Sequence, residues 1–211
     1  MRDLLNLAGE GFFPSEEIQR DVEGFLGRHQ KWNTYEHSGR VADKATQFAE
    51  RFSVPAGEAI AAAWLHDISA VIPNDERLSY AQSLSVEILE EEYQFPMLLH
   101  QKLSRVIAAA VFQVKQAAIL EAIGCHTTLR PEATRLDKVI FVADKIAWDQ
   151  NGEPPYSDAI QQGLGQSLEH ACLAYLEFLW DSRDILPGPI HPWAAAARAW
   201  LRGCIQNEEN G

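Results

Sequence analysis

The sequence predicts an all-α protein, and two observations on its residue pattern support that fold class. Apolar residues recur three and four positions apart along nearly the whole chain, as they do on one face of a helix. No Asn-Gly or Asp-Gly pair separates two alternating β-branched runs in the way that a hairpin turn would. The length of 211 residues and the hydrophobic content of 46% suit one compact domain with a sizeable core. We therefore expect a single helical bundle over residues 1–211.

Two expected helices bring histidines toward the core. In the first, over residues 37–52, one face carries residues at spacings of four, four, three and four: His37, Val41, Ala45, Phe48 and Phe52. The second, over about residues 57–68, is rich in alanine, and small side chains let neighbouring helices approach closely. We expect this second helix to be central, with His66 and Asp67 near its end.

The helical pattern continues to the C-terminal part of the chain. Further helices are expected over about residues 86–93, 98–112, 117–124, 132–148, 157–180 and 192–203, followed by a frayed tail over 206–211. The acidic stretch 86–93 is expected to face solvent. Residues 151–155, Asn-Gly-Glu-Pro-Pro, interrupt the pattern, but the apolar side chains after them need a partner surface. The C-terminal helices, residues 157–205, are therefore expected to pack on the same domain.

The charge of the chain limits its partners. Eighteen Lys and Arg residues against 30 Asp and Glu give a formal net charge of −12. Binding to duplex nucleic acid depends on clustered basic side chains, so we exclude it. A small phosphorylated substrate is compatible with this charge, because a bound metal ion can supply a local positive centre.

The sequence also predicts the cellular location of the protein and the state of its cysteines. No apolar run is long enough for a membrane span and the first residues do not resemble a secretory leader, so we expect a cytoplasmic protein without membrane contact. The three cysteines, Cys125, Cys172 and Cys204, are widely spaced and expected to be buried thiols.

Histidines and aspartates converge on the same helix edges. A single histidine on an apolar face is more often a hydrogen-bonded core residue than a ligand. Here, however, four of the seven histidines and two aspartates lie at the buried edge or end of expected helices: His37, His66, Asp67, His100, His126 and Asp144. Imidazole and carboxylate ligands together suit Fe, Mn and Zn, and a carboxylate can bridge two ions.

The order of these residues resembles a known family. His37, then His66-Asp67, then Asp144 is similar to the H…HD…D pattern of the HD-domain phosphohydrolases. Longer phrases over residues 30–150 resemble the YqeK-like branch, the symmetrical diadenosine tetraphosphate hydrolases; they are Tyr35–Ala42, Trp64–Asp67, Leu98–His100, Ala122–Thr128 and Leu136–Ile146. The resemblance implies an HD-type helical bundle.

The resemblance also implies a centre of two divalent ions. One ion would be held by His37, His66, Asp67 and Asp144, and the second by His100 and His126, with Asp67 bridging. Iron is usual in this branch, and Mn, Zn, Mg or Ni are alternatives. The implied reaction is hydrolysis of a phosphoanhydride or phosphoester by a hydroxide that the two metals activate. His66 and Asp67 would be catalytic.

Polar residues near these phrases are candidates for substrate contact. Those expected to bind phosphate are Arg40, Thr127, Thr128, Arg130, Lys138 and Lys145. Thr127 and Lys138 are also assigned to catalysis, while Thr127 could instead orient His126. Each lysine or arginine has the alternative of an exposed helix surface. No residue is identified as the general acid for the leaving group.

The remaining histidines and aromatic residues are given structural roles. His29, His170 and His191 are expected at the surface or at helix ends. Three aromatic residues, Trp148, Tyr156 and Trp180, are expected in the core rather than stacked on a base.

The chain departs from the branch at positions that face substrate. Ala70 stands in place of a lysine, Leu129 in place of a glycine, and 147–150 in place of Glu-Pro-Asn-Arg. All six ligand positions are kept, so the metal centre is predicted while the substrate, a nucleotide or dinucleoside polyphosphate, stays open.

Three functions from different classes fit the sequence. The first is a metal-dependent phosphohydrolase. The second is a non-catalytic regulatory module that binds metal and nucleotide; the missing lysine favours it, but a binding module does not need a complete two-metal set. The third, a structural metal in an interaction domain, fits least because structural sites are usually closed and four-coordinate. A homodimer is compatible with each.

Overall fold

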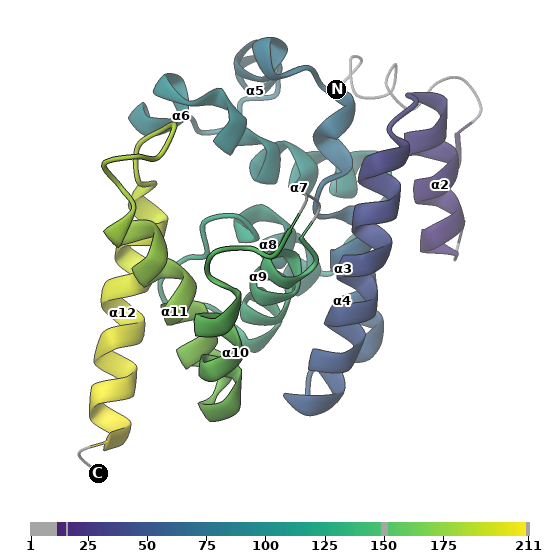
Figure 1. The fold of residues 1–211 in the computed structure, drawn as a ribbon. Coiled ribbons are helices and arrows are strands. Elements are labelled where there is room, and N and C mark those ends of the chain that lie inside the picture. The colour runs from purple at the N-terminus through teal and green to yellow at the C-terminus, as the bar shows by residue number, and fades with distance from the viewer. Residues whose placement is uncertain (1–11, 16, 149–151, 210–211) are drawn as a thin grey trace.

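In the computed structural model, every regular element of the described residues, 12–15, 17–148 and 152–209, is a helix (Figure 1). The all-α prediction is confirmed. In chain order the elements are α2 (Ile18–Arg28), α3 (Trp32–Arg51), α4 (Ala56–Leu65), η1 (Ile68–Val71), η2 (Asn74–Glu76), α5 (Arg77–Ser83), α6 (Glu90–Gln94), η3 (Pro96–Leu99), α7 (His100–Ala110), α8 (Ala117–Cys125), α9 (Arg135–Ile146), α10 (Ser157–Gln166), α11 (Leu168–Asp181) and α12 (Pro192–Glu209). None of these helices is long and apolar enough to cross a membrane.

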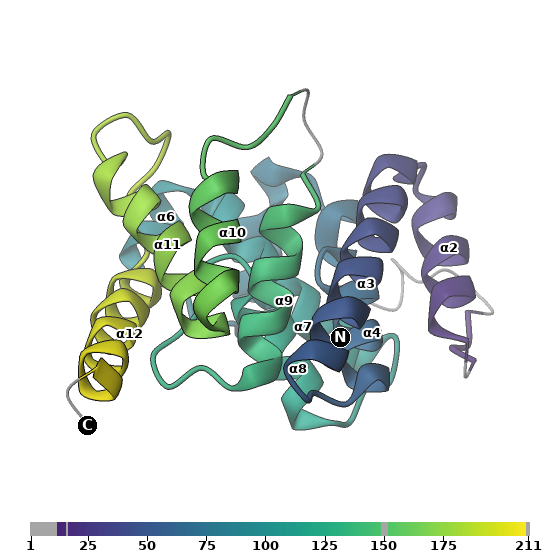
Figure 2. The same ribbon diagram turned by 60° about the horizontal axis from the view of Figure 1, so that its bottom comes forward.

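Helix α9 lies in the middle of the bundle, between α3 and α4 on one side and α10 and α11 on the other (Figure 2). It begins with a capping box, in which Thr134 accepts from the amide of Asp137. The five successive residues 139–143 are fully buried, because neighbouring helices cover the helix on all sides. This burial fixes the direction of Asp144, the next residue along the chain.

Helix α4 ends where the sequence predicted that the His-Asp pair would lie. Its alanines Ala59, Ala62 and Ala63 are fully buried, which allows close packing against α3. His66 keeps helical backbone angles, and at Asp67 the chain leaves the helix with φ −108° and ψ 18°. His66 and Asp67 therefore lie at the point where the chain leaves the end of a buried helix.

The prediction of one helix over residues 157–180 is wrong in one respect. The structure has two helices there, α10 and α11, which are separated at Ser167. Ser167 caps α11 by accepting a hydrogen bond from the amide of His170. Gly163 permits the tight contact between the two helices, because a Cβ there would lie 2.6 Å from the amide nitrogen of Ala171. A glycine followed by a capping serine is the local signal for this break.

The C-terminal helices share the core of the rest of the chain. Buried residues of α11 and α12, among them Cys172, Leu176 and Leu201, belong to the same hydrophobic cluster as Phe25 of α2 and Phe141 of α9. Helix α12 continues past the expected end at 203 to Glu209, so residues 206–209 are helical rather than frayed; residues 210 and 211 lie outside the described residues.

A buried ion pair corrects one expectation: Glu92, expected on a solvated face, is fully buried. His191 lies at a helix end, as expected, directly before α12, and is only 3% exposed. The Glu92 carboxylate is 2.7 Å from the Lys102 ammonium and 3.2 Å from Nε2 of His191. These contacts join α6, α7 and the start of α12, which are distant in sequence.

The first prediction concerns this ion pair. Glu92→Gln should lower the free energy of unfolding by about 3 kcal/mol, because it leaves the Lys102 ammonium buried without a counter-charge. Burial acts to raise the pKa of Glu92, but His191, the Leu89 amide and Lys102 together lower it below 4.5. The carboxylate's stabilisation is therefore present above pH 4.5 and is lost as pH falls through the lowered pKa.

Urea unfolding at a series of pH values measures this effect. The exposed Glu90→Gln in the same helix is the control and should change stability by less than about 0.5 kcal/mol. Equal stability of the Glu92→Gln variant and the wild type at neutral pH would contradict the prediction.

Candidate metal centre

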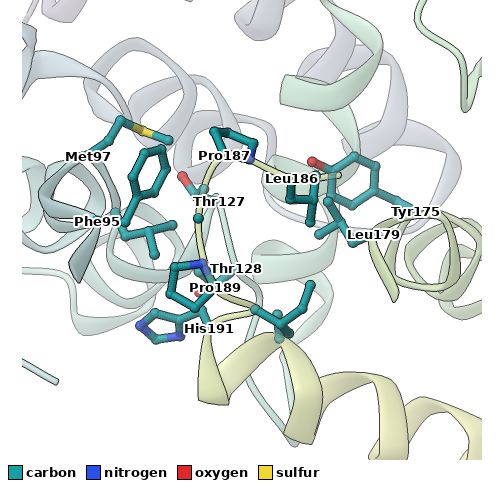
Figure 3. Close-up of a pocket in the computed structure, with 14 residues that line it drawn as sticks. Phe95, Met97, Thr127, Thr128, Tyr175, Leu179, Leu186, Pro187, Pro189 and His191 are labelled. Atoms are coloured by element: carbon teal, nitrogen blue, oxygen red, sulfur yellow. The ribbon is translucent and has the colours of Figure 1, made fainter. Parts of the chain in front are cut away.

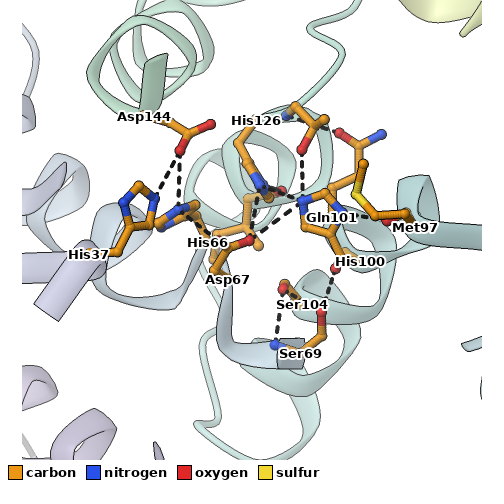
Figure 4. A network of polar contacts seen from close by, with 12 residues as sticks. His37, His66, Asp67, Ser69, Met97, His100, Gln101, Ser104, His126 and Asp144 are labelled. Atoms are coloured by element: carbon orange, nitrogen blue, oxygen red, sulfur yellow. Dashed lines mark hydrogen bonds and ion pairs between the residues drawn. The ribbon is translucent and has the colours of Figure 1, made fainter. Parts of the chain in front are cut away.

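Six side chains that the sequence singled out meet in one cluster (Figure 4). They come from α3, the end of α4, the start of α7, the end of α8, and α9; in chain order they are His37, His66, Asp67, His100, His126 and Asp144. His66 and His126 are almost completely buried, with exposed fractions of 0% and 1%. Residues separated by more than a hundred positions are thus brought within contact of one another.

Each imidazole of the cluster is oriented by a backbone carbonyl. The Nδ1 atoms donate to carbonyl oxygens at 2.6–3.2 Å, in the pairs His37–Ala147, His66–Ala63, His100–Met97 and His126–Ile123. In three of the four pairs the carbonyl belongs to the residue three positions earlier. With Nδ1 protonated, the Nε2 lone pair of each ring is left for a ligand, which is the arrangement usual for metal-binding histidines.

The first group of ligand atoms surrounds Asp144 and Asp67. Nε2 of His37 lies 3.1 Å from Oδ1 of Asp144, and Nε2 of His66 lies 3.6 Å from the same oxygen. Nε2 of His66 is also 3.5 Å from Oδ2 of Asp67. This nitrogen is fully buried and has no hydrogen-bond partner. A buried nitrogen atom that has no hydrogen-bond partner and faces two carboxylates is suited to be a ligand of a cation.

The second group uses the other oxygen of Asp67. Nε2 of His100 and Nε2 of His126 lie 3.5 Å and 3.4 Å from Oδ1 of Asp67, and 3.0 Å from each other. Since the Nδ1 atoms carry the hydrogens, two nitrogen lone pairs face one another here, and a shared cation would relieve their repulsion. The ligand atoms of His37, His66 and Asp67 lie within 4.8 Å of one another, as do those of Asp67, His100 and His126, so Asp67 belongs to both sets.

The pKa values of the cluster are shifted by burial and by its two carboxylates. Burial acts to raise the pKa of Asp67, but the His66 charge and a hydrogen bond with His126 hold it well below its usual range. Burial lowers the pKa of His100 to about 4. Burial also acts to lower the pKa of His66, but Asp67 and Asp144 outweigh it and raise this pKa to about 9. A cation that binds at neutral pH would therefore displace a proton from His66.

A hydrogen-bond network outside the cluster holds its two halves in place. Oγ of Ser69, two residues after Asp67, donates to the carbonyl of His100 at 2.8 Å and accepts from Ser104 at 3.0 Å. Gln101 is fully buried, and its Oε1 accepts from the amide of Thr127 at 3.1 Å. Sequence reasoning missed these residues, because Gln101 stands among other polar residues in the first half of α7 and no local pattern marks it as buried.

Three of the six predicted substrate contacts lie beside the cluster: Arg40, Thr127 and Lys145. The Thr127 hydroxyl is 2.8 Å from Nε2 of His100. Arg40 is exposed and lines a polar hollow of about 350 Å³ together with His37 and Asp67. Thr128 is buried and hydrogen-bonds with Gln101, so its contacts are with the protein.

The lysines of α9 have other partners. The Lys145 ammonium lies 2.5 Å from Oδ2 of Asp144, which leaves Oδ1 of that carboxylate directed at the histidines. Lys138 forms an ion pair with Glu169 and lies 5.6 Å from the ring centre of Trp200. Six positions on a helix place Lys138 and Asp144 on different faces, so this placement does not support Lys138 as a catalytic or substrate-binding residue.

Arg130 is likewise engaged away from the cluster. Its guanidinium is 2.9 Å from the buried carboxylate of Asp137 and 3.5 Å from Glu121. These pairs tie the loop after α8 to the first turn of α9. The expected phosphate contact of Arg130 is not supported by this placement.

Two of the departures from the family pattern, Leu129 and Ala147, can be placed in the structure. Leu129 has a positive φ of 58°, a conformation that favours glycine, and its side chain is fully buried in the core. The leucine therefore changes packing rather than a substrate contact. The carbonyl of Ala147 accepts the hydrogen bond of His37. Asp149 and Gln150 lie outside the described residues.

His29 and His170 lie at helix ends, as expected: His29 ends α2, and Nδ1 of His170 lies 2.9 Å from Oγ of Ser167 at the start of α11. Tyr156 is buried in the core, and Trp148 is partly buried against it, with an edge-on ring contact at 5.9 Å. Trp180, expected in the core, is only half-buried and is not part of the core cluster; its ring centre lies 4.3 Å from the Arg198 guanidinium.

A largely apolar pocket adjoins the second group of ligands (Figure 3). Its volume is about 160 Å³, which corresponds to roughly five water molecules at the density of the liquid. Thr127 lies between Phe95 and Met97 on one side and Leu186 and Tyr175 on the other. Because Thr127 contacts both the pocket and His100, a ligand in the pocket would lie next to the cluster.

Comparisons with known proteins agree with this site. A family model described as HD domain matches residues 34–149, which include all six residues of the cluster. A Lactococcus lactis subsp. cremoris protein, described as uncharacterized and in the pepC 5′ region, is 38% identical over 141 residues, 67% of this chain and 71% of that protein. A symmetrical bis(5′-nucleosyl)-tetraphosphatase of Bacillus subtilis (strain 168) is 28% identical over 192 residues, 88% of this chain and 96% of that protein.

A solved structure has the same fold. It is a Clostridium acetobutylicum protein described as an HD superfamily hydrolase involved in NAD metabolism. The TM-score is 0.78 at 25% sequence identity, and the match covers 92% of this chain and 100% of that one. The HD-type bundle expected from the sequence is thereby confirmed.

The second prediction tests cation binding with two matched histidine variants. Saturating Mn²⁺ should raise the melting temperature of the wild type by roughly 5–10 °C, the shift expected at about a hundredfold excess over Kd. His66→Gln should lose this shift because it removes the buried Nε2 ligand. His170→Gln, outside the cluster, should keep it. Equal shifts in all three proteins would contradict a cation site at His66.

Proposed function

The chain belongs to the HD-domain family, and from that premise we propose that this hydrolase cleaves a nucleotide or dinucleoside polyphosphate at a centre of two divalent ions. The observation that carries the proposal is the position of Asp67. Its two carboxylate oxygens face different histidine groups, Oδ2 toward His66 and Oδ1 toward His100 and His126. A carboxylate shared in this way is suited to bridge two ions, whereas a single structural ion needs only four ligands.

The ligand set fits first-row divalent ions, with iron first and Mn, Zn, Mg and Ni as alternatives. Two such ions would polarise a phosphoryl oxygen and acidify a water molecule. The chain itself orients these ligands, since the backbone carbonyls fix the imidazoles and Lys145 holds one oxygen of Asp144. The burial of His66 and His126 limits the access of bulk water to the inner side of the cluster.

A nucleoside substrate is supported by the apolar pocket and by the relatives. A pocket of this size accommodates the fused rings of one base, and Thr127 places it beside His100. Arg40 at the polar hollow is available for a phosphate group of the substrate. The B. subtilis relative is named as an enzyme that acts on dinucleoside tetraphosphates. Cytoplasmic location and a homodimer stay predictions.

The third prediction tests hydrolysis and metal binding together. Asp67→Asn should lower the rate of substrate hydrolysis, followed by chromatography of the nucleotide products, at least about a hundredfold and reduce the metal content together with it, because both ligand groups lose the shared carboxylate. The assay is a screen of dinucleoside polyphosphates, nucleoside mono-, di- and triphosphates and cyclic nucleotides, with metal content measured by mass spectrometry. The exposed Asp43→Asn in α3 is the control and should match the wild type.

Two outcomes would contradict the proposal. Wild-type turnover in both Asp67→Asn and His66→Ala would exclude the cluster as the catalytic centre. Binding of metal and nucleotide without hydrolysis of any compound in the screen would favour the regulatory module instead.

The fourth prediction concerns the apolar pocket. Leu179→Trp should fill it and raise KM for a nucleoside polyphosphate by about tenfold, while KM for inorganic tripolyphosphate stays unchanged. Leu179→Met keeps the side-chain volume and should behave like the wild type. Parallel changes in KM for both substrates, or no change for either, would show that the base binds elsewhere.

A further inference from the structure

Arg77, the first residue of α5, has a half-buried guanidinium without a counter-ion. Its Nη1 donates to the carbonyl of Met97 at 3.1 Å, and its Nε is fully buried with no hydrogen-bond partner. Among the described residues, no carboxylate forms an ion pair with it. Burial lowers the pKa of Arg77, as expected for a charge that has lost part of its hydration.

The other buried or paired arginines show why Arg77 is unusual. Those that bind carboxylates are Arg105, Arg130, Arg198 and Arg202. A guanidinium has five N–H donors in a planar fork that matches carboxylate and phosphate. At Arg77 part of this fork is occupied by two neutral acceptors, the Met97 carbonyl and, at 3.5 Å, Oδ1 of Asn74, so its charge is left for an anion that is not part of the described chain.

Arg77 lies beside the second half of the metal centre. The Met97 carbonyl that accepts from Arg77 also accepts from Nδ1 of His100 at 2.6 Å. The guanidinium and the His100 ring therefore share one oxygen atom. Its charge also acts on His100, whose pKa it helps to lower, and the charge of Asp67 acts on Arg77 in turn.

The His100 ring lies between this guanidinium and the ligand atoms of the cluster, because its Nδ1 faces the shared Met97 carbonyl and its Nε2 faces Asp67. The Met97 side chain lines the apolar pocket, so the Met97 turn connects the pocket, His100 and Arg77. A substrate with several linked phosphates could place one phosphate at the cluster and the next at Arg77. A single phosphate could occupy only one of these positions.

We propose that Arg77 is a substrate-binding residue that holds a second phosphate group, next to the one at the metal ligands, and so selects substrates with two or more linked phosphates. This inference rests on the proposed function of the cluster. It adds a specificity-determining residue from α5, which carries none of the six ligands.

The experiment uses the metal-loaded full chain and titrates inorganic pyrophosphate and inorganic phosphate by calorimetry. Arg77→Gln should weaken pyrophosphate binding by about tenfold or more, the usual effect of losing a charged hydrogen bond, and should change phosphate binding much less. Arg77→Lys keeps the charge and should recover part of the affinity. The control, Arg105→Gln, removes a surface arginine that is 47% exposed and should bind like the wild type.

Metal content and melting temperature are measured for every variant, because Arg77 also tethers the turn that holds His100. The inference is overturned if Arg77→Gln binds pyrophosphate as the wild type does, or if the wild type does not bind pyrophosphate. It is also overturned if Arg77→Gln loses metal, or if Arg77→Lys recovers nothing. Failure of the proposed function would appear separately, as a wild type that binds pyrophosphate but hydrolyses no nucleotide.

Discussion

The candidate metal centre depends on hydrogen bonds between imidazole rings and backbone carbonyls. A histidine side chain can rotate and can carry its proton on either nitrogen, so residue type alone does not make it a ligand. Here each Nδ1 faces a carbonyl, and each Nε2 faces the cluster. For His66, His100 and His126 that carbonyl lies one helical turn earlier, so ring orientation follows from the helix itself. For His37 it lies at the end of α9, so its orientation depends on the tertiary fold.

The core places these helices so that their ends meet. Helix α9 is buried on all sides over residues 139–143, and it packs against both the helix that ends at His66 and the helix that carries His37. The buried pair of Glu92 and Lys102 also fixes the positions of helices, because it joins α6 to α7 and, through His191, to α12. A buried pair of this kind contributes specificity of arrangement more than net stability.

The net charge of −12 does not show where the positive side chains lie or which of them are paired. Most basic side chains near the centre of the bundle are neutralised, as Lys138 is by Glu169 and Lys145 is by Asp144. Arg40 and Arg77 are the exceptions beside the cluster, one exposed and one half-buried. An acidic protein can therefore present a small positive region to an anion, with bound cations supplying the rest.

The sequence by itself determined the helical class and the six histidines and aspartates that converge, because periodicity and residue type are local properties of the chain. It also located His66 and Asp67 at a helix end, which the alanine-rich pattern before them indicates. Only the tertiary structure decided which basic residues remain available. Lys138 shares a helix with Asp144 but turns toward Glu169, whereas Arg77 has no motif around it and reaches His100 through a carbonyl twenty positions away. Such contacts depend on how separate helices pack, and no local pattern encodes them.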